Sequence, residues 1–122
     1  MRLLDAWTAL ALAARERGLS RARWLLVAGR SGRWLAAHGC AWARAFAPLL
    51  AASALAIEGR SSAAETLARA RAALAAHDLG LAVACADLAS GSAQGAAWAA
   101  RERVVRPERL SAVLVPGFSR WS

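Results

Sequence analysis

Lysine is absent from this 122-residue chain, and all sixteen of its basic residues are arginine. Protein kinases and Walker-type nucleotide-binding proteins use a lysine to hold the phosphates of their nucleotide. The chain also has no glycine-rich phosphate loop and no His-Arg-Asp catalytic loop. Kinase and P-loop chemistry is therefore excluded for this chain.

Patterns for strands and membrane spans are also missing. Tyrosine is absent, strand-favouring residues are few, and alanine, the best helix former, makes up roughly three residues in ten. No segment reaches the ~18–20 uninterrupted apolar residues of a membrane helix. The nearest candidate, residues 79–100, contains Asp87 and a Ser-Gly-Ser turn. We therefore predict an all-α domain with no membrane span.

Cysteine is scarce, which bears on the compartment. Cys40 and Cys85 are too few for a disulfide framework, so a reducing compartment is expected. The apolar run near the N-terminus is interrupted by Asp5 and followed by Arg15, which disfavours a signal peptide. We expect a cytoplasmic protein.

Residues able to bind metals or to act in catalysis are scattered along the sequence. His38 with Cys40, and His77 with Asp78, do not follow any zinc-ligand spacing, and a closed zinc site needs four ligands. Cys85 has no histidine at helical spacing that could activate it as a nucleophile. We expect no metal, no cofactor and no enzymatic activity.

The strongest pattern runs over residues 42–78 and predicts two antiparallel helices joined by a turn at residues 58–61. Their apolar stripes recur at spacings of three and four: Leu50, Ala54 and Ile57 in the first, and Ala63, Leu67, Ala70 and Leu74 in the second. Gly59 suits the left-handed residue that ends a helix, and Ser62 with Glu65 predicts a capping box. This helix pair is the best-supported element of the sequence.

Similar patterns predict about seven helices over residues 1–118, followed by a frayed tail at residues 119–122. A first helix at residues 2–17 ends at Gly18, and Ser20 is expected to cap a second helix that breaks near residues 29–32. A proline in its first turn predicts the last helix, starting near Pro107. The residues expected to face the core in the second half are Leu81, Cys85, Leu88, Ala97, Ala100, Val104, Leu110, Val113 and Leu114.

The helix pairs repeat at a spacing near thirty-four residues, which is the tetratricopeptide period. We therefore expect a right-handed stack of antiparallel helix pairs that forms a single helical-repeat domain. In such stacks each unit contacts its neighbours, and exposed ends can self-associate.

Several segments resemble a known family. They are Trp42-Ala43, Ala47-x-Leu49-Leu50-x-Ala52, Gly59, Ala76-His77-Asp78, Ala97-Trp98, Pro107-Glu108-Arg109-Leu110 and Leu114-Val115-Pro116-Gly117-Phe118. Together they resemble the C-terminal tetratricopeptide-like tail of large myxobacterial serine/threonine protein kinases, which carry a kinase domain, an ATPase-type region and helical repeats. The resemblance covers residues 20–118. It implies a scaffold or regulatory role, with catalysis in a kinase domain that this chain lacks.

Positive charge is concentrated in the first half of the chain. Residues 1–60 carry nine arginines and three acids, whereas residues 61–122 carry seven arginines and five acids. Six arginines cluster in sequence around Trp24 and Trp34 and form the candidate partner-binding surface: Arg15, Arg17, Arg21, Arg23, Arg30 and Arg33.

Three hypotheses for the chain remain open, and its arginine-rich surface also has a purely structural interpretation. A protein or peptide partner is favoured because arginine and tryptophan are common at binding hot spots. An arginine/tryptophan-rich nucleic-acid binder is the alternative, and its affinity would fall steeply with salt. In a simpler interpretation, both tryptophans are core residues and the arginines form a solvated face. A truncated gene fragment without independent function is the third possibility for the whole chain.

Overall fold

The computed structural model describes residues 2–118, apart from the side chain of Arg2, and that range is helical without strands. The helices are α1 (Arg2–Arg15), α2 (Gly18–His38), α3 (Ala41–Arg44), α4 (Ala47–Ile57), α5 (Ala63–Ala76), α6 (Gly80–Ser90), α7 (Ala93–Arg101) and α8 (Pro107–Leu114). α3 is a single turn, and the other seven are eight to 21 residues long. The predicted all-α class with about seven helices is confirmed.

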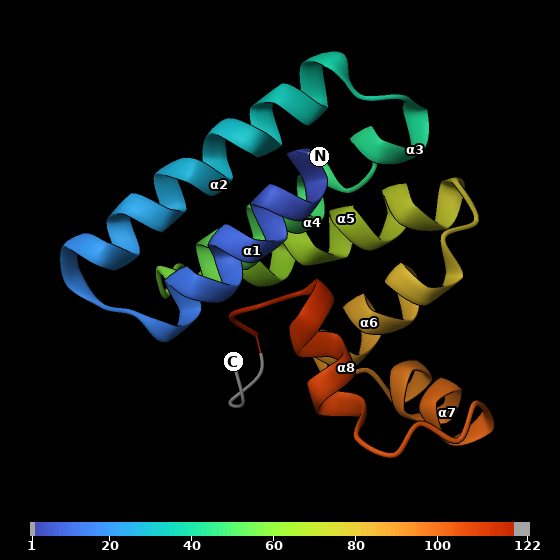
Figure 1. The fold of residues 1–122 in the computed structure, drawn as a ribbon. Coiled ribbons are helices and arrows are strands. Elements are labelled where there is room, and N and C mark those ends of the chain that lie inside the picture. The colour runs from blue at the N-terminus through green and yellow to red at the C-terminus, as the bar shows by residue number, and fades with distance from the viewer. Residues whose placement is uncertain (1, 119–122) are drawn as a thin grey trace.

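Most helices pack against the next one along the chain, and the first and last helices meet. α1 pairs with α2 and α4 pairs with α5, each antiparallel, while α6 packs against α5, α7 and α8 (Figure 1). The indole nitrogen of Trp7 in α1 donates a hydrogen bond of 2.9 Å to the carbonyl oxygen of Leu114 in α8. An open solenoid has no such contact between its first and last units. The tetratricopeptide-like arrangement stays a prediction.

The α4–α5 pair forms as expected at its turn and along its stripes. The predicted residues of both stripes are buried, except Ala54, which is partly buried. Gly59 has a φ of +73°, the left-handed conformation that ends α4. The expected start near Trp42 is wrong, because α3 is a separate turn and α4 begins at Ala47, with Pro48 in its first turn.

The predicted capping box at the start of α5 is absent. Ser62 has helical backbone angles (φ −75°, ψ −5°), and its side chain makes no cap hydrogen bond. A capping side chain requires an extended backbone at that residue. The hydroxyl of Thr66 instead donates to the carbonyl oxygen of Ser62 at 2.9 Å.

Helix α2 is continuous, so the break expected at residues 29–32 does not occur. Ala28, Ser31 and Leu35 form a buried face that packs on α1 and α4. This packing outweighs the roughly 1 kcal/mol that each interior glycine costs a helix. The expected cap at Ser20 is also wrong, because α2 already begins at Gly18.

In the second half of the chain, the buried faces differ from the predicted ones. The fully buried residues of α6, α7 and α8 are Ala82, Ala84, Cys85, Ala86, Asp87, Gly95, Ala99 and Ser111. Leu81 and Val113, both expected in the core, are exposed, as are Ala97 and Ala100. Leu88, Val104, Leu110 and Leu114 are partly buried. Because alanine lies on every side of these helices, the spacing of apolar residues does not indicate which side is buried.

None of the helices in residues 2–118 has the length and apolar character needed to cross a lipid bilayer. The tail predicted at residues 119–122 lies outside the described residues.

Candidate functional site

The six arginines of the predicted surface do not converge on one point. Arg15 ends α1 and Arg17 directly precedes α2 without a side-chain cap hydrogen bond, so both lie at the α1–α2 connection, close in sequence to Arg21 and Arg23. Arg33 lies ten residues beyond Arg23 on the same helix, about 15 Å away along its axis. The structure therefore brings four of the six together and places Arg30 and Arg33 farther along α2.

Arg21 is a structural residue. Its Nε donates to the carbonyl oxygens of Ala13 at 3.0 Å and Glu16 at 2.8 Å, and its Nη1 donates to that of Ile57 at 3.4 Å. These carbonyls lie at the C-terminal ends of α1 and α4, where the helix leaves acceptors unpaired and the dipole favours a cation. Arg21 thus ties two helix ends together, and the candidate surface loses one member.

The two tryptophans of the surface already have partners. The guanidinium carbon of Arg23 lies 5.7 Å from the ring centroid of Trp24, within cation–π range. Trp24 is partly buried and packs on the core. Trp34 stacks on His38, with ring centroids 5.2 Å apart and an interplanar angle of 26°. A nucleic-acid base that stacked on either ring would have to compete with these contacts.

Large apolar side chains lie exposed between the arginines of α2, which the sequence reasoning missed. Leu19, Leu26 and Trp34 are 89%, 53% and 41% exposed. With Arg23 and Arg30 they recur at spacings of three and four residues and so share one side of the helix. We call these five residues the outer α2 face. The signal in the sequence was the seven-residue spacing of Leu19 and Leu26.

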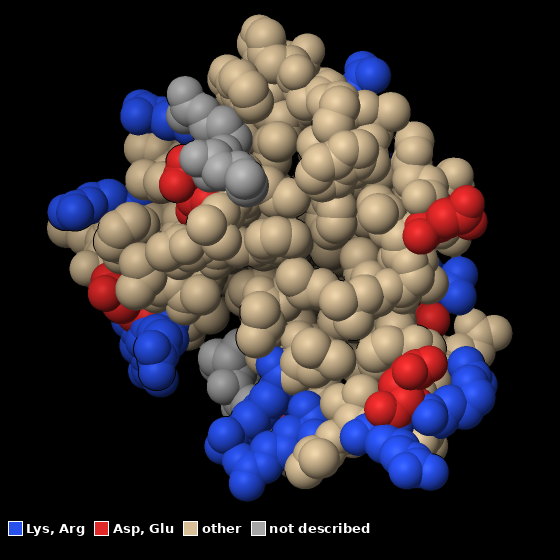
Figure 2. All heavy atoms as spheres, turned by 45° about the vertical axis from the view of Figure 1, so that its right-hand side comes forward, with Lys and Arg blue, Asp and Glu red and all other residues tan. Residues whose placement is uncertain are grey.

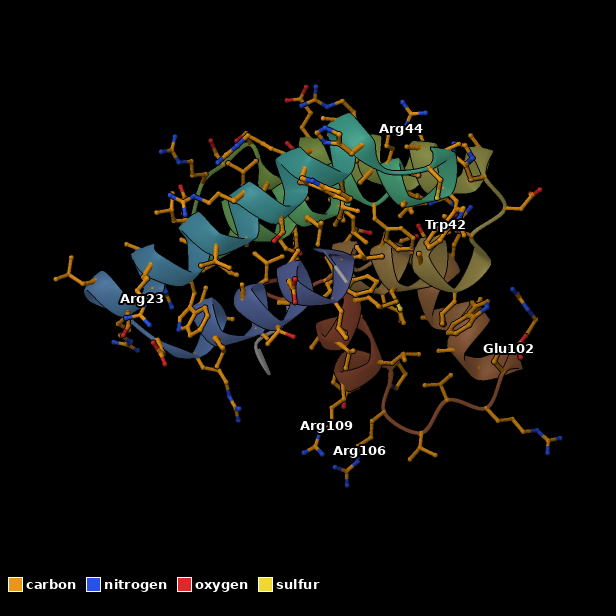
Figure 3. The ribbon with its side chains drawn as sticks, turned by 45° about the horizontal axis from the view of Figure 1, so that its top comes forward. Arg23, Trp42, Arg44, Glu102, Arg106 and Arg109 are labelled. Carbon is orange, nitrogen blue, oxygen red and sulfur yellow. The ribbon has the colours of Figure 1, made fainter. Side chains whose placement is uncertain are left out.

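The charges do not form a continuous basic surface on the side of the molecule shown in Figure 2. Arginine side chains lie around the rim of that view, several of them beside acidic side chains, and its centre is uncharged. Arg23, near the start of α2, and Arg44, beside α3, project from the molecule at well-separated places (Figure 3). Nucleic-acid binders instead gather basic residues into a patch or stripe.

Two cysteines differ sharply in environment. Cys85 is completely buried, and burial raises the pKa of its thiol to about 11. At neutral pH it is therefore protonated and a poor nucleophile. Cys40 is exposed at the start of α3. Within residues 2–118 no three His, Cys, Asp or Glu side chains are arranged to hold a metal ion.

A partly exposed ion pair, in which Asp87 is buried and the Arg71 side chain is 40% exposed, connects three helices. The guanidinium of Arg71 in α5 donates through Nε and Nη2 to the carboxylate of Asp87 in α6, the Nη2 bond being 3.2 Å long. The same Nη2 donates to the side-chain oxygen of Gln94 in α7, also at 3.2 Å. The hydrogen bonds and the charge of Asp87 raise the pKa of Arg71. This network orders α5, α6 and α7 relative to one another.

The comparisons with known proteins give no relative. No protein-family model matches the chain, and neither a curated protein nor a solved structure matches it. The resemblance to kinase tails therefore rests on the residues quoted above.

Proposed function

We propose that this chain is a non-catalytic helical module that binds a protein partner through the outer α2 face. The observation that carries the proposal is the exposure of Leu19, Leu26 and Trp34 on the same side of a helix as Arg23 and Arg30. Exposed apolar side chains grouped with arginine and tryptophan are typical of protein-binding sites. α2 has 21 residues and so presents about 31 Å of helix to a partner.

A protein partner is favoured over nucleic acid by the groups on this face. A phosphate backbone has no apolar groups that could cover the two leucines, whereas the apolar stripe of a partner helix can cover them. Arg21 is used within the fold, and the ring of Trp24 packs on the core and lies against Arg23. A nucleic-acid interface would therefore start with fewer contacts than the sequence suggests.

The kinase-tail resemblance makes a regulatory or scaffold role in the cytoplasm part of the same proposal. Reading the DNA upstream of Met1 in all three frames tests this origin. A kinase or ATPase coding region there supports a tail separated from its parent. A promoter with a ribosome-binding site at Met1 supports an independent helical adaptor.

Site-specific photo-crosslinking tests the binding surface in cells that express the chain. A photoreactive residue replaces Leu26 on the outer α2 face or, as a matched control, Ala72, which is exposed on α5. We expect a protein adduct that forms at position 26 and not at position 72, and that is lost when Arg30→Glu is added. Adducts that are identical at both positions, or that consist of nucleic acid, would contradict the proposal.

Two further measurements separate the alternatives. Anisotropy of a labelled single-stranded oligonucleotide, measured across salt concentrations, reports nucleic-acid binding, which would weaken steeply with salt. Cooperative urea unfolding distinguishes a folded module from a fragment. Leu67→Asp, which buries a charge at a side chain only 2% exposed, serves as the unfolded control.

A further inference from the structure

A groove with a volume of about 550 Å³ lies between α1 and α8. We call it the α1–α8 groove. On α1 its wall includes Leu4, Trp7 and Ala11, which follow the three- and four-residue spacing of a single helix face. On α8 its wall includes Val113, whose side chain is 67% exposed. The groove is therefore apolar and bounded by two helices.

The floor of the groove is held in place by internal contacts. The hydrogen bond from Trp7 to the carbonyl oxygen of Leu114 joins the two walls directly. The Trp7 ring also packs edge-to-face on Phe46, with centroids 5.4 Å apart and an interplanar angle of 82°. A preformed site costs less to occupy than one that must first be ordered.

The charged residues that line the groove are both arginine. Arg15 comes from the end of α1 and Arg109 from the first turn of α8, and both are exposed. Arg106 lies beside Arg109, and the two side chains project outward together at the start of α8 (Figure 3). Among residues 2–118, no Asp or Glu lines the groove. Its electrostatic complement is an acidic ligand.

We propose that the α1–α8 groove binds an acidic amphipathic helix of a partner protein. A third helix fits between two helices by placing apolar side chains every three or four residues into the space between them. The α1 wall extends from Leu4 to Arg15, about 16 Å, which corresponds to three turns of a bound helix. The bound helix carries leucine-like residues toward Trp7 and carboxylates toward Arg15 and Arg109.

This site extends the proposed function to a second docking surface and names the chemistry of its occupant. It uses residues of α1 and α8 and none of the outer α2 face. The two proposals can therefore fail separately, since variants in one surface leave the other unchanged.

The test uses two synthetic helical peptides and the full chain. Both peptides have about 15 residues, enough for helix formation when bound, with leucine on one face. Glutamate flanks the leucine face in the first peptide, and lysine replaces every glutamate in the second. Fluorescence anisotropy measures both affinities, and we expect the chain to prefer the glutamate peptide.

A charge swap then locates the binding site. Arg15→Glu combined with Arg109→Glu should lower the affinity for the glutamate peptide by about fivefold and make the lysine peptide the tighter ligand. The expected change is modest because each ion pair between an exposed arginine and a glutamate contributes little. The matched control, Arg23→Glu with Arg30→Glu, makes the same change in net charge on the outer α2 face and should keep the original preference. Circular dichroism verifies that each variant remains helical.

A second variant probes the apolar wall independently. Ala11→Glu changes an exposed residue, so the fold is expected to persist while a carboxylate enters the groove and repels the glutamate peptide. The proposal is overturned if neither peptide binds saturably, if the charge swap leaves the preference unchanged, or if the control pair inverts it equally.

Discussion

Replacing two glycines by alanine should change stability in opposite directions. Gly32 lies in the middle of α2, and a Cβ atom added there meets nothing within 4 Å. Gly95 lies in α7 against α6, where a Cβ atom would lie 2.6 Å from the backbone nitrogen of Leu88 and 2.8 Å from the carbonyl carbon of Asp87. The chemical change is identical, so any difference reports the surroundings.

The size of each effect follows from these contacts. Gly32→Ala gains helix propensity at no steric cost, which raises the free energy of unfolding by about 1 kcal/mol. At Gly95 the clash is with backbone atoms that cannot rotate away, so α6 and α7 must move apart. Overpacking of this kind costs about 1–3 kcal/mol. The loss outweighs the gain in propensity, and Gly95→Ala is expected to destabilise the protein.

Urea and thermal unfolding followed by circular dichroism measure both variants. For a chain of this size, Gly32→Ala should raise Tm by about 4 °C, while Gly95→Ala lowers it. If Gly32→Ala destabilised the protein, α2 would be broken at residues 29–32, as its glycines alone suggest. If Gly95→Ala were neutral, the close approach of α6 and α7 would be refuted.

Three more predictions follow from the contacts of single side chains. Arg21→Ala should lower the free energy of unfolding by about 2 kcal/mol, because the carbonyls at two helix ends lose their charged donor. The control Arg23→Ala should change the free energy of unfolding by less than about 0.5 kcal/mol. Equal urea midpoints for the two variants would contradict this prediction. Asp87→Ala should cost about 1–2 kcal/mol, seen as a lower urea midpoint, because Arg71 loses both hydrogen bonds to the carboxylate and keeps only the one to Gln94. A thiol reagent should modify exposed Cys40 at once and buried Cys85 only on unfolding. Burial raises the pKa of the Cys85 thiol from 9.0 to about 11, so the unfolded chain loses this proton at lower pH than the folded chain does. The free energy of unfolding should therefore fall as pH rises from 9.0 toward about 11.

The helix pair at residues 42–78 was predictable because its apolar stripes contain large residues. Leu50, Ile57, Leu67 and Leu74 define one side of each helix, and all four are buried. In the second half alanine surrounds the helices, so spacing alone does not decide which side is buried. The side of α7 that is buried is the one that carries Gly95, because the lack of a side chain there lets α7 approach α6 closely.

The sequence shows where arginine is frequent but not how each arginine is used. Six arginines lie between residues 15 and 33, yet the acceptors of Arg21 include the carbonyl of Ile57, 36 residues away. Such a contact depends on the packing of α1, α2 and α4 and leaves no local pattern. The exposure of Leu26 depends in the same way on which side of α2 meets its neighbours.

The composition of the core is consistent with the two proposed surfaces. Alanine is the commonest buried residue, which lets helices pack closely, while Leu4, Leu19, Leu26 and Val113 remain largely exposed. A monomer that had no partners would gain stability by burying these larger side chains, since each contributes about 1.5–3 kcal/mol when fully buried. They lie on the outer α2 face and in the α1–α8 groove, both of which contain arginines, whereas Trp42, Leu81 and Val105 are exposed on neither surface. This division between a small-residue core and large apolar residues beside arginine favours a protein whose remaining apolar surface is completed by a partner.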